Sequence, residues 1–166
     1  MRLGLFTSLA VPLLGHIALG YEVQTPPLDT DWTYDVGTDP WPEYPRPQLQ
    51  RENWQSLNGI WKFAPDDGQG AIPAPGALNQ DVLVPSCIES GLSGIQTLDV
   101  TTAWFSTEFD LPKWSNSSER ILLNFEAVDY EATVYINGQE AGFHRGGYWR
   151  FTIDATKFVK RGTNTL

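Results

Sequence analysis

The sequence has 166 residues, of which 41% are hydrophobic and 19% charged, so it is long and apolar enough to bury the core of one folded domain. Its formal net charge is −9, from 11 Lys and Arg against 20 Asp and Glu. Such a surface repels phosphate polyanions, which excludes nucleic acid as a partner. Cys87 is the single cysteine, which excludes an intramolecular disulfide and a cysteine-based metal cluster. We expect no cofactor and no metal.

The first segment, residues 1–20, reads "MRLGLFTSLAVPLLGHIALG". A basic start, a short apolar run and small residues at its end are typical of a secretory signal peptide, here cleaved after Gly20. A membrane anchor is the alternative, but Pro12 lies inside a run that is already short. We therefore expect a secreted, extracellular protein without a membrane association. Secretion would make Asn116, in the sequon Asn-Ser-Ser, a usable glycosylation site.

Residues 21–50 are rich in proline, aspartate and aromatic residues and show no helical or strand periodicity. Six prolines between Pro26 and Pro47 remove backbone donors and disfavour regular pairing. This segment is predicted to be an extended N-terminal arm that packs its aromatic side chains on something larger.

From Leu57 onward, short runs of β-branched and aromatic residues alternate with Gly, Pro, Asn and Asp. Apolar residues recur at a spacing of two in several runs, for example at Ala132, Val134 and Ile136. Strands are predicted at 59–64, 81–84, 103–111, 120–126, 131–136, 139–143 and 149–154.

The dipeptide Asn137-Gly138 is the strongest turn signal, because a tight hairpin needs positive φ at both central residues. Seven short strands with almost no helical periodicity indicate an all-β protein, an antiparallel β-sandwich. Residues 51–166 are predicted to form it.

Motifs for catalysis are missing. The stretch from Gly91 to Ile95 lacks the last glycine of the G-x-S-x-G serine elbow, and His144 would be the only histidine after removal of the leader. The sequence contains no phosphate-binding glycine motif and no ligand spacing for zinc. We expect no catalytic residue in this chain.

Four segments, in chain order, carry a resemblance to a known family. They read "SLNGIWKF", "VPSCIES", "AWFSTEFDLP" and "LLNFEAVDYEATVYINGQEAGFHRGGYWRFTID". Together they resemble the N-terminal sugar-binding domain of family 2 of the glycoside hydrolases, which includes β-galactosidases, β-glucuronidases and β-mannosidases. The resemblance spans about residues 51–166 and implies a jelly-roll sandwich of the galactose-binding-domain type.

In that family, retaining hydrolysis uses two carboxylates that reside in a later TIM barrel. A barrel alone takes about 250 residues, more than this chain has. The resemblance therefore implies a non-catalytic fragment of a secreted exo-glycosidase acting on β-glycosides, truncated at its C-terminal end. Its expected partners are carbohydrate and the missing immunoglobulin-like and barrel domains.

The resemblance also suggests residues at the rim of the sugar site. The loop 143–148 occupies the position from which family members reach toward the glycone, so His144, Arg145 and Tyr148 are candidate sugar contacts. Glu89, in the loop 88–94, is a second candidate. Many family members carry Glu where this chain has Arg145, and Trp149 replaces a smaller or polar residue.

Four alternatives stay open. His144 can simply satisfy a backbone group, and Asp129 and Tyr130 can serve as a turn acid and an aromatic residue packed on the neighbouring strand. The chain can also be an autonomous lectin-like module whose exposed Trp residues grip polysaccharide, or a scaffold whose loops contact only protein.

Overall fold

The structure is a computed structural model, and it describes residues 20–66, 68, 70–74, 76–111 and 119–166. The predicted signal peptide, apart from Gly20, and the sequon at Asn116 lie outside the described residues. Among the helices of the described residues, none has the length and apolar character needed to cross a membrane.

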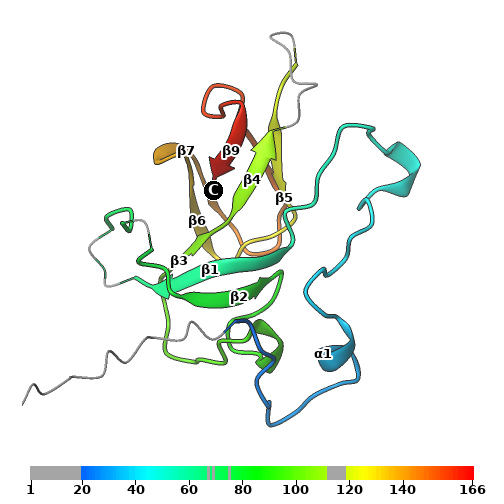
Figure 1. Ribbon diagram of the computed structural model, residues 1–166, viewed down its shortest axis with the longest axis vertical. Coiled ribbons are helices and arrows are strands. Elements are labelled where there is room, and N and C mark those ends of the chain that lie inside the picture. The colour runs from blue at the N-terminus through cyan, green and yellow to red at the C-terminus, as the bar shows by residue number, and fades with distance from the viewer. Residues whose placement is uncertain (1–19, 67, 69, 75, 112–118) are drawn as a thin grey trace, which may run out of the picture.

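The described residues form an all-β domain preceded by an irregular arm (Figure 1). The strands are β1 (Gly59–Pro65), β2 (Gln80–Val84), β3 (Ala103–Ser106), β4 (Glu108–Leu111), β5 (Leu122–Phe125), β6 (Glu131–Ile136), β7 (Gln139–Arg145), β8 (Phe151–Asp154) and β9 (Gly162–Thr165). The hydrogen-bonded groups are β2-β1-β3, β4-β9, β5-β8 and β6-β7, and every pair is antiparallel.

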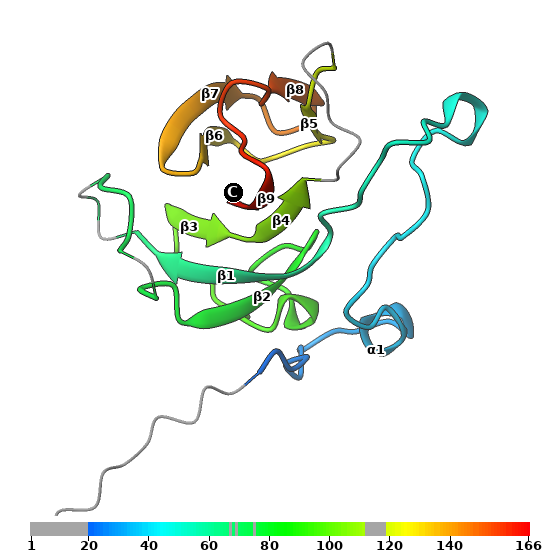
Figure 2. The same cartoon turned by 45° about the horizontal axis from the view of Figure 1, so that its top comes forward.

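These groups form the two sides of a sandwich. Figure 2 shows β1, β2 and β3 on one side and β5 to β8 on the other, with β4 and β9 between them. The predicted antiparallel β-sandwich is thereby confirmed.

The core lies between the two sides of the sandwich, because alternate residues of each strand point inward. Phe63 on β1 and Leu83 on β2 are fully buried, as is Ile136 on β6. A cluster around Ile136 is completed by four further buried residues, Leu123, Val134, Ile153 and Ala155.

The predicted strand 103–111 is in fact two strands that belong to different sheets. Its first half, β3, pairs with β1, whereas its second half, β4, pairs with β9. At the break, Thr107 exchanges two backbone hydrogen bonds of 2.9 Å with Leu166. The sequence prediction also missed β9, because this strand is polar and its one buried residue is Asn164.

The predicted hairpin at Asn137-Gly138 is confirmed. Both residues have positive φ, 51° and 78°, and they join β6 to β7. The pairing then slips by one residue, since Val134 is opposite Gly142 but Tyr135 is opposite Glu140. The bulge leaves Ala141 as the extra residue on β7.

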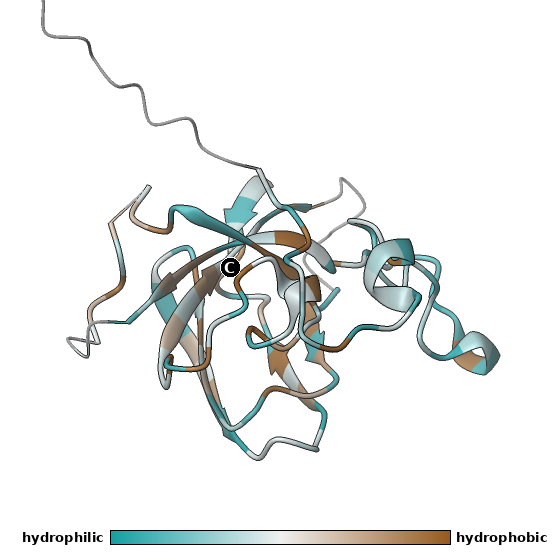
Figure 3. Cartoon of the chain, turned by 90° about the horizontal axis from the view of Figure 1, so that it is seen from below, coloured by the Kyte–Doolittle hydropathy of each residue, from teal (hydrophilic) through white to brown (hydrophobic). Residues whose placement is uncertain are grey.

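The N-terminal arm contains two short helices that the sequence did not predict, α1 (Trp32–Asp35) and the 3-10 turn η1 (Pro47–Leu49). Proline fits the start of η1 because it lies at the first position, where its missing N–H needs no partner. In Figure 3 the arm is mostly teal and white, in keeping with its polar composition. Trp32 and Trp41 are 68% and 65% exposed, so these aromatic rings do not pack on the domain.

The start of the arm is nevertheless attached to the loop that follows β2. The Tyr21 hydroxyl donates to the Leu92 carbonyl at 2.6 Å, and the Gln24 N–H donates to the Gly91 carbonyl at 2.9 Å. Partial burial raises the pKa of Tyr21 above its ordinary value, so the phenol stays protonated and able to donate.

Candidate functional site

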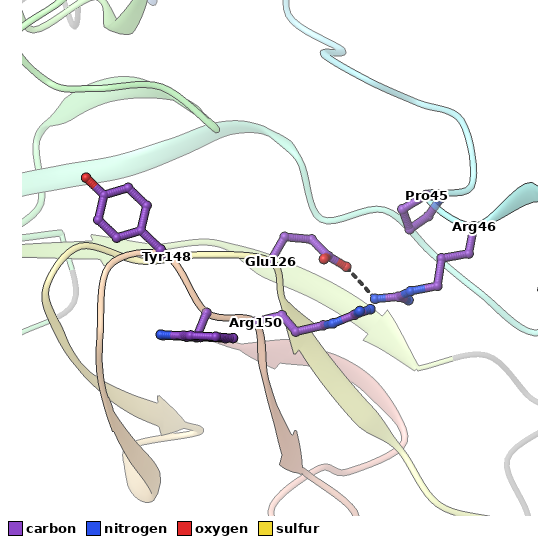
Figure 4. A pocket seen from close by; sticks show the side chains of 6 residues that line it. Pro45, Arg46, Glu126, Tyr148 and Arg150 are labelled. Carbon is purple, nitrogen blue, oxygen red and sulfur yellow. Dashed lines mark hydrogen bonds and ion pairs between the residues drawn. The ribbon is translucent and has the colours of Figure 1, made fainter.

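An open groove of about 560 Å³ lies where the arm meets the segment leading into β8. Its lining residues are Pro45, Arg46, Glu126, Tyr148, Trp149 and Arg150. Figure 4 shows the side chains of Arg46, Glu126 and Arg150 directed toward one another at one end, and Tyr148 at the other.

The arm supplies one wall of the groove. Tyr44 and Trp54 meet edge to face with ring centroids 5.1 Å apart, which brings together the two ends of the loop between them. Arg46 lies in this loop, and its Nη2 donates to Glu126 Oε1 at 2.8 Å. The ion pair fixes the arm against the end of β5.

The other wall is formed by consecutive exposed residues that precede β8. Tyr148 is 96% exposed and Trp149 74% exposed, so neither ring contributes to the core. Arg150 follows them, and in the described part of the chain it has no ion-pair partner. The groove therefore combines two available aromatic rings with one uncompensated positive charge.

His144 lies on β7, outside the lining of this groove. Its ring stacks on Phe151 with centroids 4.1 Å apart, and its Nε2 lies 3.2 Å from the Gly146 carbonyl oxygen. If Nε2 carries the proton, it donates to that carbonyl, which is the backbone role that sequence reasoning left open.

The sequence prediction placed Arg145 in a loop after the hairpin, and this is wrong. β7 continues to Arg145, which lies opposite Glu131 of β6. Arg145 Nη2 is 2.5 Å from Glu131 Oε1, and such cross-strand charge pairs stabilise antiparallel pairing and so extend the strand. The loop proper begins at Gly146.

The two glycines after β7 allow a close approach to the preceding turn. The Gly146 N–H donates to the Tyr130 carbonyl at 2.8 Å. A Cβ atom on Gly147 would lie 2.5 Å from Asp129 Oδ1, so only glycine fits there without displacement of that carboxylate. Tyr130, for which packing on the neighbouring strand was an alternative, is 58% exposed.

The second candidate loop, 88–94, is folded around Ser93 in the 3-10 turn η2 (Gly91–Ser93). This side chain is fully buried and its hydroxyl donates to the Ser90 carbonyl at 2.7 Å, while it accepts from the Ile95 N–H at 3.0 Å. A hydroxyl so engaged is not available as a nucleophile.

Glu89 is exposed and lies beside Cys87. Partial burial raises the pKa of the Cys87 thiol, and the hydrogen bond to Glu89 and the charges of Glu89 and Asp129 raise it further. The thiol is therefore neutral near pH 7 and unreactive. Because the charge of Asp129 acts on Cys87, this loop lies near the turn at Asp129, which Gly147 contacts.

Of the predicted site residues, the structure brings only Tyr148 into the groove; His144, Arg145 and Glu89 are not among its lining residues. Sequence reasoning missed Arg46, Glu126 and Arg150. Tyr148 ends the predicted loop 143–148 and Arg150 lies two residues beyond it, whereas Arg46 and Glu126 are 80 residues apart in sequence. In the described ranges, no group of three or more His, Cys, Asp or Glu side chains has the arrangement of a metal site.

A family model described as "Glycosyl hydrolases family 2, sugar binding domain" matches residues 84–166, half of the chain. The chain belongs to this family. The groove and both candidate loops lie largely in the matched region, apart from the arm residues Pro45 and Arg46.

Individual relatives agree with this family assignment. The chain is 42% identical over 64 residues to a putative β-glucuronidase of Formosa agariphila, covering 39% of this chain and 8% of that protein. It is 29% identical over 145 residues to the β-glucuronidase of Canis lupus familiaris, covering 79% of this chain and 22% of the relative. The chain thus spans about a fifth or less of the length of these relatives.

Solved structures give the same result. A β-glucuronidase from Ruminococcus gnavus, in complex with a C6-substituted uronic isofagomine, superposes with a TM-score of 0.56 at 30% identity. The match covers 70% of this chain and 21% of that one. A β-glucuronidase from an uncultured Clostridium species gives a TM-score of 0.53 at 31% identity, with 66% and 20% covered.

Proposed function

We propose that this chain is the non-catalytic, carbohydrate-binding N-terminal domain of a secreted exo-glycosidase of the β-glucuronidase type. The observation that carries the proposal is the asymmetry of coverage: 79% of the chain aligns with only 22% of the canine β-glucuronidase. Retaining hydrolysis of a β-glycoside takes two carboxyl groups held about 5–5.5 Å apart across the scissile bond. In this proposal both belong to a barrel domain outside the 166 residues.

Within such an enzyme the domain would hold the rim of the sugar site. Gly146 and Gly147 let the backbone fold tightly onto the turn at Asp129, which directs residues 148–150 outward. Tyr148, with 96% of its surface exposed, offers an aromatic face to a sugar ring or to the adjoining domain. Residues 1–20 would serve as the signal peptide, 21–50 as the arm and 51–166 as the sandwich.

The test is an activity measurement on two proteins. The 166-residue chain is assayed with 4-nitrophenyl β-D-glucuronide and β-D-galactoside, beside a longer protein translated from any reading frame that continues past Leu166. We expect no hydrolysis above the buffer rate by the short chain and turnover by the long one. Turnover by the short chain would overturn the proposal.

Secretion is tested separately. The precursor is expressed in a secretory host, and the mass of the exported protein is measured. Export with cleavage after Gly20 supports the signal peptide. A protein that stays in the cell with residues 1–20 still attached argues against it.

A second candidate function is an autonomous lectin-like module, favoured by the exposed Trp32, Trp41 and Trp149. Calorimetric titration of the chain with galactose, glucuronate and mannose separates the two. Micromolar binding by the chain alone supports the module, and absence of binding leaves the enzyme domain.

A further inference from the structure

We propose that the groove between the arm and residues 148–150 binds the carboxylate or sulfate group of an acidic saccharide, with Arg150 as the anion-binding residue. The inference rests on the proposed carbohydrate-binding function and specifies the class of sugar. It starts from the difference in charge between the groove and the whole chain. The chain has a net charge of −9, yet two of its 11 basic side chains line this groove.

The charges of the groove do not cancel. Glu126 accepts from Arg46 at 2.8 Å, which neutralises one guanidinium. In the part of the chain that the structure describes, Arg150 has no such partner, although its side chain is directed toward the same end of the groove (Figure 4). One positive charge is left to attract an anion.

The guanidinium of Arg150 favours an oxyanion that offers two acceptor oxygens side by side. A guanidinium presents its N–H donors in a fixed fork that matches two oxygens of a carboxylate or sulfate. Arg46 pairs with the Glu126 carboxylate and so, among the described residues, leaves the Arg150 guanidinium as the uncompensated charge at this end. A lysine would supply charge without this geometry.

The aromatic residues specify that the anion is carried by a sugar. Tyr148 and Trp149 expose 96% and 74% of their surfaces at the other wall, and the apolar C–H face of a pyranose stacks on such rings. At about 560 Å³ the groove falls within the size range of small-molecule sites.

The experiment is calorimetric titration of the 166-residue chain in 20 mM NaCl with three hexasaccharides. Oligogalacturonate carries carboxylates, a carrageenan hexamer carries sulfates, and cellohexaose is neutral. The variants are Arg150→Gln and Trp149→Ala. The matched control is Arg161→Gln, which removes the same charge from an exposed arginine outside the groove.

We expect at least one acidic hexamer to bind ten times more tightly than cellohexaose. Arg150→Gln should raise its Kd about tenfold, Trp149→Ala should weaken all binding, and Arg161→Gln should change Kd less than twofold. Raising NaCl to 300 mM should weaken the binding of the acidic hexamers but not that of cellohexaose. Comparison of the Kd values of the two acidic hexamers shows whether the site prefers carboxylate or sulfate. Both variants change exposed side chains, so circular dichroism should show an intact fold.

Three results would overturn the inference. Equal binding of neutral and acidic hexamers would leave sugar binding and remove the anion site. Equal weakening by Arg150→Gln and Arg161→Gln would reduce the effect to net charge, and absence of binding by every hexamer would remove the groove as a site. None of these depends on hydrolysis of a chromogenic glycoside, which tests the proposed function itself.

Discussion

Asn137 Nδ2 donates a hydrogen bond of 2.9 Å to Asn164 Oδ1 and so ties the hairpin turn to the last strand of the sandwich. Asn137 also pairs with Thr165 through its backbone N–H, at 2.9 Å, and through its Oδ1, at 3.1 Å. The turn that joins β6 to β7 is therefore fixed by β9, which is distant in sequence.

Asn164 is the polar centre of this connection and should be costly to replace. It is 1% exposed, donates to the Lys160 and Gly162 carbonyls and accepts from the Lys160 N–H as well as from Asn137. Asn164→Ala leaves buried groups unpaired, at about 1–3 kcal/mol for such a group. We expect urea unfolding to show a loss of about 2–4 kcal/mol.

Asn53→Ala, at an exposed position, is the control for Asn164. It should change the unfolding free energy by less than about 0.5 kcal/mol. A loss below about 1 kcal/mol for Asn164→Ala would mean that water replaces the lost bonds and that the network contributes little.

Gly142 allows β7 and β8 to pack closely, because a Cβ atom there would overlap Cδ1 of Ile153. Gly142→Ala should destabilise the fold by about 1–3 kcal/mol through overpacking. Ile153→Val removes that methyl group and alone should cost about 0.5–1.5 kcal/mol. The double variant should be less destabilised than the sum of the two in thermal unfolding. Strict additivity would show that the strain at Gly142 arises elsewhere.

The hairpin was predictable because its cause is local. The turn needs positive φ at both central residues, and Asn137 and Gly138 are residue types that adopt it readily. The division of 103–111 into two strands was not, because Thr107 changes sheets where it pairs with Leu166 at the far end of the chain. The strand β9 was missed for a related reason, since its buried residue is polar and gives no apolar alternation.

The candidate site divides in the same way. Tyr148 could be named from the family resemblance of the segment around it, and its exposure needs no distant partner. Arg145 was misplaced because its partner Glu131 is on another strand and extends the pairing. The groove as a whole depends on the contact between Arg46 and Glu126, which no local pattern encodes.

The Arg46–Glu126 ion pair should control the position of the arm more than the stability of the domain. Both side chains are partly exposed, 35% and 59%, and exposed pairs contribute about 0–1 kcal/mol. Arg46→Gln should leave the melting temperature nearly unchanged but increase the rate of proteolytic cleavage between Tyr44 and Trp54 severalfold. Limited proteolysis followed by mass spectrometry measures this rate.

The charge-swapped double variant, Arg46→Glu with Glu126→Arg, is the control for the ion pair. It should restore protection of the arm toward that of the unaltered chain, because the pair is re-formed with opposite polarity. Equal cleavage rates in Arg46→Gln and the unaltered chain would show that the Tyr44–Trp54 ring contact holds the arm by itself.

Protonation of the Asp154 carboxylate should make the domain less stable in acid. The Thr156 hydroxyl donates to Asp154 Oδ1 at 2.6 Å and the Thr156 N–H at 3.1 Å, and with Arg120 and Lys157 nearby these bonds hold the pKa of Asp154 below its ordinary value of 3.8. Because the pKa is lower in the folded state, the stabilisation is complete above about pH 3.8 and is lost as pH falls through the folded pKa. Thr156→Val should move the pKa upward and flatten the pH dependence of the melting temperature in this range, whereas Thr156→Ser should preserve both. Carbon-detected NMR titration of the Asp154 carboxyl measures the shift, and an identical pKa in Thr156→Val would show that the hydroxyl is not its cause.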